Sequence, residues 1–183
     1  DMPVNFIDGG LIGLNPVKEN ERTRLYVSGK ATALVRQLDG RGLVVRDLGG
    51  EIGRASAMKM VYASSTKGAF SLFAAVAVMA ELTGLRDEIF AELAASQPHT
   101  MATIERMAPR IPLDAKRWIF EMDEIASTYD AYGMTAHFHQ GAADIMKLAN
   151  QTPLASETRE TAQDNRALAD VLQLYVDALR AEG

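Results

Sequence analysis

The sequence predicts a small α/β segment followed by an all-helical domain, and two observations predict this class. Eight of the 14 glycines lie within residues 1–50, where short apolar runs end at glycine, as strands do at turns. From Arg54 onward no proline occurs before Pro98, and Ala, Leu, Met and Val, which favour or tolerate helix, dominate. The sequence therefore divides between residues 50 and 51.

Three strand candidates and one short helix are expected in the first segment. An apolar run at residues 4–7 ends in Asp8-Gly9-Gly10, which is a turn signal. Residues 24–28 and 43–48 are the second and third strand candidates, and residues 31–38 between them carry apolar side chains at helical spacing. This strand–helix–strand order is typical of an α/β unit.

Six helices are expected after residue 53. The first covers residues 54–83, which is about 45 Å long at ~1.5 Å per residue, and Gly84 suits its C-terminal end. Prolines and Gly133 separate the others, which we expect at residues 86–95, 101–107, 114–132, 135–150 and 156–182.

The charge balance and the apolar runs exclude some classes of partner. The formal net charge is -5, so we expect neither a nucleic-acid partner nor a polybasic membrane-binding surface. The longest uncharged run, Gly68 to Ala80, is shorter than the ~20 residues of a membrane-spanning helix. That run predicts a core or dimer-interface helix, and no membrane segment is expected.

Cysteine and histidine usage limits the chemistry. The chain has no cysteine, which excludes a disulfide scaffold, a thiolate zinc site and a cysteine nucleophile, and which fits a reducing compartment. We therefore expect a cytoplasmic protein. On a helix, His137 and His139 would point about 200° apart and could not share an ion, so we expect two ordinary histidines and no metal site.

The most informative segment runs from Gly50 to Ser64, where a glycine-rich turn leads into a long apolar helix. Lys59 lies there among Ala57, Met58, Met60 and Val61. A lysine in apolar surroundings pays a desolvation cost that favours its neutral form, so it can serve as a general acid or base. The alternative is a lysine whose stem lies on the core and whose ammonium reaches solvent.

These residues resemble a known family. The order Gly50-x-x-Gly53-x-Ala55-x-x-x-Lys59 resembles the Gly-x-x-Gly-x-Gly-x-x-x-Lys segment of the β-hydroxyacid dehydrogenases, which include 6-phosphogluconate and 3-hydroxyisobutyrate dehydrogenases. Asp8-Gly9-Gly10 is similar to the Ser-Gly-Gly substrate loop of that family. Residues 56–68 and 117–126 look closest to a little-characterised branch of the superfamily. The resemblance covers residues 1–150.

The resemblance implies a fold, a site and an assembly. Residues 1–50 would be the C-terminal part of a Rossmann-like NAD(P)-binding domain, and residues 51–183 an all-helical substrate and dimerisation domain of the 6-phosphogluconate dehydrogenase type. Lys59 would be the catalytic acid/base, and Asp8, Gly9, Gly10 and Ser64 would bind the substrate. NAD or NADP would be the cofactor, and the helical domain would form a homodimer.

Several positions depart from the family pattern. The family usually has Asn one helical turn after the lysine, on the same face, and that position is Ala63. Ser64 is the nearest polar substitute, but it lies about 140° round the helix from Lys59. The Lys-Asp pair that the family has near the cofactor is Met122-Asp123. Asp8 replaces the substrate-loop serine and adds a negative charge, which makes sugar-acid carboxylates less welcome.

The family's first cofactor motif is missing from the sequence. A Gly-x-Gly-x-x-Gly turn lets the pyrophosphate approach a helix N-terminus, and no such spacing occurs here. The cofactor-binding residues therefore stay unassigned. The chain begins at Asp1 rather than Met, and we expect it to be part of a longer enzyme.

Three functions are consistent with the sequence. The first is an NAD(P)-dependent oxidoreductase that moves a hydride to or from a small hydroxy acid or related carbonyl compound, with Lys59 as acid/base. The second is a catalytically inactive metabolite-binding or dimerisation module of the same fold, because Ala63 and Met122 replace functional residues. The third is an imine-reducing relative. Such relatives usually lack the lysine, so Lys59 argues against it.

Overall fold

A computed structural model describes residues 4–13, 23–163 and 165–181 of the chain. The chain forms two compact units, Asp1–Ala63 and Ser64–Gly183, which are described separately below. The sequence places its domain boundary one helix earlier, between residues 50 and 51.

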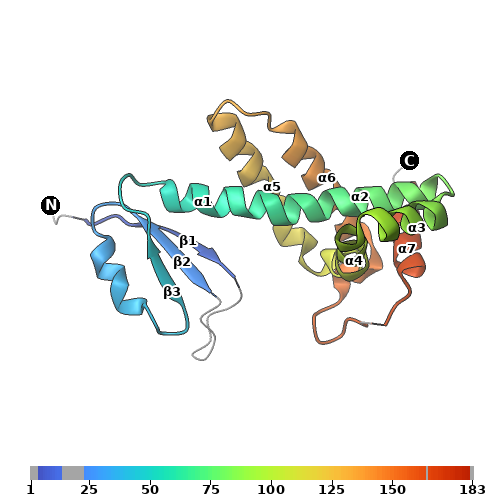
Figure 1. The fold of residues 1–183 in the computed structure, drawn as a ribbon, viewed down its shortest axis with the longest axis horizontal. Helices are drawn as coiled ribbons and strands as arrows, with labels where there is room; N and C mark the ends of the chain where they lie inside the picture. Colours follow the sequence, from blue (N-terminus) through green and yellow to red (C-terminus); the bar gives the residue numbers. More distant parts are fainter. Residues whose placement is uncertain (1–3, 14–22, 164, 182–183) are drawn as a thin grey trace. The chain divides into compact units, whose positions relative to one another are not determined.

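The first unit holds a three-stranded sheet with the order β1-β2-β3, whose strands lie side by side in Figure 1. β1 (Asp8–Ile12) runs antiparallel to β2 (Arg24–Ser28), and β2 runs parallel to β3 (Val44–Asp47). The connection from β2 to β3 contains a 3-10 helix, η1 (Thr32–Leu38). The predicted strand–helix–strand unit is therefore confirmed.

The predicted first strand is wrong. Residues 4–7 have no regular structure, and Asp8-Gly9-Gly10, expected as a turn, instead begin β1. The helix that follows β3, α1 (Arg54–Ala63), explains the glycine. A Cβ atom on Gly10 would lie 2.6 Å from the backbone oxygen of Ala55, so only glycine lets α1 lie this close to the strand. A glycine inside a strand often marks such a close backbone approach.

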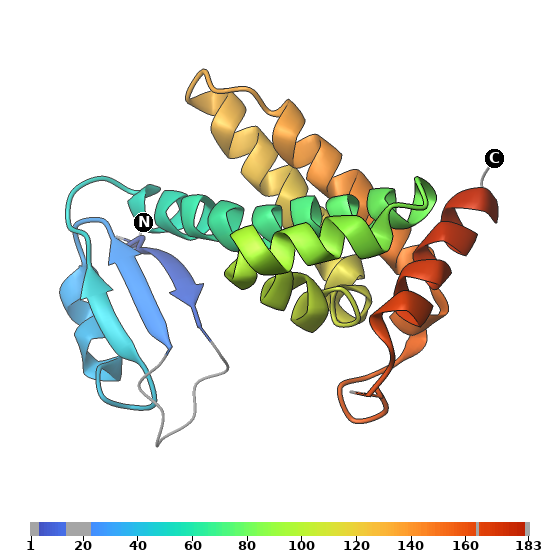
Figure 2. The same cartoon turned by 45° about the vertical axis from the view of Figure 1, so that its right-hand side comes forward.

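The second unit is all-helical. α5 and α6 form an antiparallel pair, which Figures 1 and 2 show in yellow and orange. The regular α-helices of this unit are α2 (Ala69–Leu82), α3 (Arg86–Ser96), α4 (Pro98–Met107), α5 (Ile111–Ala131), α6 (His137–Gln151) and α7 (Leu168–Ala181). The predicted class, a small α/β segment followed by a helical domain, is confirmed.

The core of this unit lies between α5, α6 and α7. Met122 and Ile125 of α5 and Met146 of α6 are completely buried, with four more buried residues on α7. Tyr175 of α7 is also buried, and its hydroxyl donates a 3.0 Å hydrogen bond to the backbone oxygen of Ala108. This bond satisfies a polar group that would otherwise destabilise the core.

The predicted helix over residues 54–83 is interrupted. α1 and α2 are separated by a π-helical turn, η2 (Ser64–Gly68), which contains the sequence Ser-Ser-Thr-Lys-Gly. The run Arg54–Leu82 is long and apolar enough to cross a membrane by length and composition, a test that core helices of soluble proteins also pass. π-Turns of this kind are rare and occur often at functional sites.

The predicted last helix is wrong in its first half. Pro153–Ser156 form a short 3-10 helix, η3, and α7 begins only at Leu168. The segment between them is polar and is held by its own side chains, because the Thr158 hydroxyl exchanges hydrogen bonds with Thr161 and the Glu157 carboxylate binds Arg166. Such local hydrogen bonds compete with helix. Residue 182, the predicted end, lies outside the described residues.

Replacing Gly10 by alanine is expected to destabilise the first unit by about 1–3 kcal/mol, because the new methyl group collides with the backbone of α1. Urea unfolding followed by far-UV circular dichroism measures this. Gly9→Ala is the matched control, since its Cβ would lie 3.6 Å from the Leu25 side chain, an ordinary contact. Equal loss of stability in both variants would contradict the prediction.

Candidate functional site

The N-terminus of α1 is built around the carboxylate of Asp8. Oδ2 of Asp8 accepts hydrogen bonds from the backbone N–H groups of Gly53, Ala55 and Ser56, at 3.0, 2.9 and 3.0 Å, and from the hydroxyl of Ser28 at 2.8 Å. The hydroxyl of Ser56 donates to Oδ1. A helix N-terminus has unpaired N–H donors, so this carboxylate caps α1 from a neighbouring strand.

The contacts keep Asp8 ionised although it is only 8% exposed. Burial raises the pKa of this carboxyl group, but the hydrogen bonds from Ser56, Ser28 and the Ala55 backbone outweigh burial and hold the pKa below its ordinary value. Hydrogen bonds to the charged form have this effect. The negative charge that the sequence adds at position 8 is therefore balanced by helix donors.

Lys59 lies two residues past the last of these donors, Ser56 being the third helical residue and Lys59 the sixth. Its Cβ atom is 3.1 Å from where a Cβ on Gly10 would stand, so Lys59 emerges beside β1. Asp8 and Gly10 face α1 on the buried side of the strand, whereas Gly9 is exposed on the other side. The structure thus brings together Asp8, Gly10 and Lys59 but not Gly9, and their functional roles stay predictions.

A pocket of about 470 Å³ lies in the same unit, where β2 ends and the loop before α1 passes. Ligands of α/β sheets bind at the carboxyl ends of parallel strands. Its charged groups are Lys30 and Glu51, and the rest of the lining is Val4, Asn5, Phe6, Gly29, Ala31, Gly50 and Ile52.

Ser64, the fourth predicted substrate-binding residue, belongs to the second unit and opens the π-turn η2. Its hydroxyl is 2.7 Å from the hydroxyl of Tyr129 on α5. Near the other end of the turn, Nζ of Lys67 is 3.2 Å from Glu121 on the same helix. Two polar contacts, about two helical turns apart on α5, therefore hold the π-turn in place.

His139, expected to be an ordinary histidine, is the most unusual polar residue of the second unit. It is 2% exposed, and neither ring nitrogen has a hydrogen-bond partner among the described residues. Its ring lies 4.4 Å from the ring of Tyr129, centroid to centroid, and close to Gly68 of the π-turn. Burial lowers the pKa of His139. The exposed His137 instead lies 3.0 Å from Gln140.

Tyr129 and His139 were missed because their significance depends on pairing between distant helices. Nothing in the local sequence places Tyr129 against Ser64, 65 positions earlier. The one available signal for His139 was its position among the apolar residues of α6, which predicts burial.

The residues that replace the family's Lys-Asp pair have separate environments. Met122 is 0% exposed in the core, whereas Asp123 is exposed and lines a polar pocket of about 410 Å³ with Asp130 and His137. Glu121, expected on a solvated acidic stripe, has a side chain only 12% exposed and paired with Lys67 and Arg117, so that expectation is wrong. The described residues contain no group of three or more ligating side chains placed for a metal ion.

Comparisons with known proteins agree on the fold. The family model described as a domain of unknown function, DUF1932, matches residues 80–149. A conserved hypothetical protein of Sinorhizobium meliloti 1021 is 20% identical with a TM-score of 0.73, over 94% of this chain and 57% of that chain. The conserved protein MTH1747, described as structurally similar to 3-hydroxyacid dehydrogenases, is 20% identical with a TM-score of 0.54, over 97% and 57%. No curated protein matches the chain.

The chain spans 57% of the length of each of these solved structures. Its described part has the 3-hydroxyacid dehydrogenase-like fold, and the DUF1932 match lies in the helical unit. The superfamily and the fold class that the sequence resembles are thereby confirmed.

Replacing Asp8 by asparagine is expected to cost about 1–2 kcal/mol at neutral pH, because the cap loses its charge. The folded-state pKa of Asp8 lies below its ordinary value of 3.8, so the carboxylate stabilises above that value and the stabilisation is lost as pH falls through the folded pKa. The difference between wild type and D8N should therefore shrink on acidification.

Urea unfolding at a series of pH values tests this. Asp39→Asn is the matched control, because the carboxylate of Asp39 also accepts one backbone N–H, from Val45, at an exposed position. A wild-type-to-D8N difference that does not change between neutral and acidic pH would argue against the Asp8 cap.

Protonation of His139 is expected to destabilise the second unit. Its folded-state pKa is below the ordinary 6.5, so the unfolded chain binds more protons and stability falls as pH drops through 6.5, by at most ~1.4 kcal/mol per pH unit. His139→Phe should flatten this dependence. Unfolding followed by the fluorescence of Trp118, the single tryptophan, measures it, with His99→Phe as control for losing one histidine. Parallel pH profiles for wild type and H139F would refute the assignment.

Proposed function

From its 3-hydroxyacid dehydrogenase-like fold, we propose that this chain belongs to an NAD(P)-dependent oxidoreductase acting on a small hydroxy acid or related carbonyl compound. Lys59 is the acid/base: its Nζ takes the proton of the substrate hydroxyl during oxidation and returns it during reduction. The observation that carries the proposal is the placement of Lys59 beside Gly10 by the Asp8-capped helix α1.

This placement is what an acid/base residue requires. A catalytic side chain must be held in a fixed geometry by the elements that carry it. α1 is fixed to β1 by the close approach at Gly10 and to Asp8 by three backbone hydrogen bonds. Gly10 and the half-buried Lys59 thereby form one wall of the substrate pocket, and Ser64 supplies a hydroxyl from the second unit.

The described residues do not form a site for the cofactor. β2 is followed by Gly29 and a 3-10 helix, and β3 by a turn leading to α1, whose N-terminal donors are taken by Asp8. Neither connection leaves a helix N-terminus for a pyrophosphate. NAD or NADP therefore enters the proposal from the resemblance alone, as the group that accepts or donates the hydride.

A second candidate function is a metabolite-binding or dimerisation module of the same fold without catalysis. One observation favours it: both positions where the family has polar functional residues are occupied by core side chains, Ala63 and Met122, which are buried. Lys59 favours the oxidoreductase over this module.

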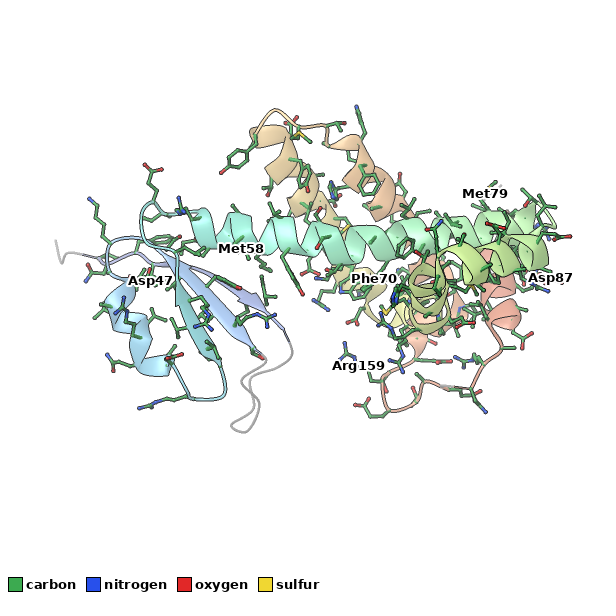
Figure 3. The ribbon with its side chains drawn as sticks, in the orientation of Figure 1. Asp47, Met58, Phe70, Met79, Asp87 and Arg159 are labelled. Carbon is green, nitrogen blue, oxygen red and sulfur yellow. The ribbon has the colours of Figure 1, made fainter. Side chains whose placement is uncertain are left out.

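We further propose a homodimer formed through the second unit. Leu72, Val76 and Met79 share one face of α2 and are all exposed, and Met79 is labelled in Figure 3. Beside them lies a groove of about 440 Å³ that Leu85 and Ile89 also line. An apolar surface of this kind is typical of an interface. The proposal includes a small-molecule substrate, no nucleic-acid or membrane partner, and a cytoplasmic location.

Lys59→Met is expected to lower turnover by about 10²–10⁴-fold while the protein stays folded, because it removes the proton-transfer group and keeps the side-chain stem. NAD(P)H absorbance with a panel of hydroxy acids and neutral alcohols measures turnover in the natural protein. Lys116→Met, at an exposed position of α5, is the matched control. Unchanged turnover in K59M would favour the non-catalytic module.

Wild-type protein is expected to have twice the 19.9 kDa mass of the chain in light scattering. Met79→Glu should shift it to the single-chain mass, because a buried unpaired carboxylate is costly in an apolar interface. Phe120→Glu, at an exposed apolar residue of α5, should remain dimeric. A wild-type monomer would reject the interface.

A further inference from the structure

We propose that Asp8 determines specificity: its carboxylate fills the anion site at the N-terminus of α1, so the pocket beside Lys59 takes an uncharged hydroxy or carbonyl compound. A substrate carboxylate or phosphate is excluded from that place. This inference deepens the proposed function and rests on Lys59 as its acid/base.

The N-terminus of α1 is a complete anion site. Helix N-termini attract anions, because unpaired N–H groups and the helix dipole point at the same place. Here the N–H groups of Gly53, Ala55 and Ser56 converge on one oxygen, and two serine hydroxyls, from Ser28 and Ser56, complete the set. α1 has no acidic residue in its own first turn, so Asp8 supplies the negative charge from β1.

The occupied site lies next to the proposed acid/base. Asp8 and Gly10 are two residues apart on β1, and both face α1. Ala55 and Lys59 are one turn apart on α1, and Gly10 approaches both. A substrate whose hydroxyl contacts Lys59 therefore sits close to the Asp8 carboxylate. A second anion at the α1 N-terminus would meet a like charge and find its donors already used, whereas a hydroxyl or carbonyl group would not.

The direct test is an anion titration of the full chain, read from the backbone amide NMR signals of Gly53, Ala55 and Ser56. Malonate and inorganic phosphate are the anionic probes, and malonamide is the uncharged match for malonate. In wild type we expect no saturable shift of these three signals with either anion. Asp8→Ser removes the carboxylate and should produce saturable shifts with both anions and none specific to malonamide. Asp39→Ser, which removes a carboxylate elsewhere in the unit, should behave as wild type.

Asp8→Asn keeps a capping oxygen and removes the charge, so it carries the test if Asp8→Ser does not fold. For this variant the signals of Gly10 and Lys59 should respond to malonate, which they ignore in wild type. Saturable anion binding at the three amides of wild type would overturn the inference. So would folded Asp8 variants that gain no response.

This readout does not depend on turnover. If Lys59→Met keeps full activity, the proposed function fails while the anion titration still decides whether Asp8 closes the site. If wild-type amides bind malonate, the specificity inference fails and the Lys59 assignment is unaffected. The two failures are therefore distinguishable.

Discussion

The hydrogen bonds from the α1 N-terminus to the carboxylate of Asp8 are the interaction on which the first unit depends. They satisfy N–H groups that a helix cannot satisfy itself, and they do so with a residue from the sheet rather than from the helix. The cap therefore fixes the helix to the strand as well as closing its end. The glycine two residues along β1 then allows the two backbones to meet, with a Cβ clearance that no other residue would permit.

This arrangement connects local structure to chemistry. A lysine one and a half turns into α1 has its position set by contacts made at the helix start, so the cap acts on function through geometry. It also acts through charge, because the carboxylate uses the donors that would otherwise attract an anionic substrate. The serine-to-aspartate departure from the family pattern thus has a structural consequence, and the argument from added charge alone was incomplete: the helix neutralises that charge.

The second unit uses a different device at the start of its first helix. A π-turn is held to α5 by a hydroxyl pair at Ser64 and an ion pair at Lys67, and a buried imidazole lies against its last residue. A side chain larger than glycine at position 68 would press on Phe138 and His139, within 3.5–3.7 Å. The polar groups of η2 are therefore matched to one packing of α5 and α6, and His139 pays an unpaired-nitrogen cost inside it.

The sequence by itself determined the fold class, the helical order of the second unit and the candidate lysine, because glycine spacing, apolar periodicity and a short motif are local signals. It misassigned Asp8-Gly9-Gly10 as a turn, since a glycine that permits a close approach looks the same in sequence as one that permits a turn. It also joined α1 to α2 and extended α7 backward, because the π-turn depends on partners on α5 and the Thr158 segment on its own hydrogen bonds. Only the tertiary structure decided that Asp8 caps α1, that Tyr129 meets Ser64 and that His139 is buried without a partner. Each of these depends on residues far apart in the chain, whose contacts no local pattern encodes.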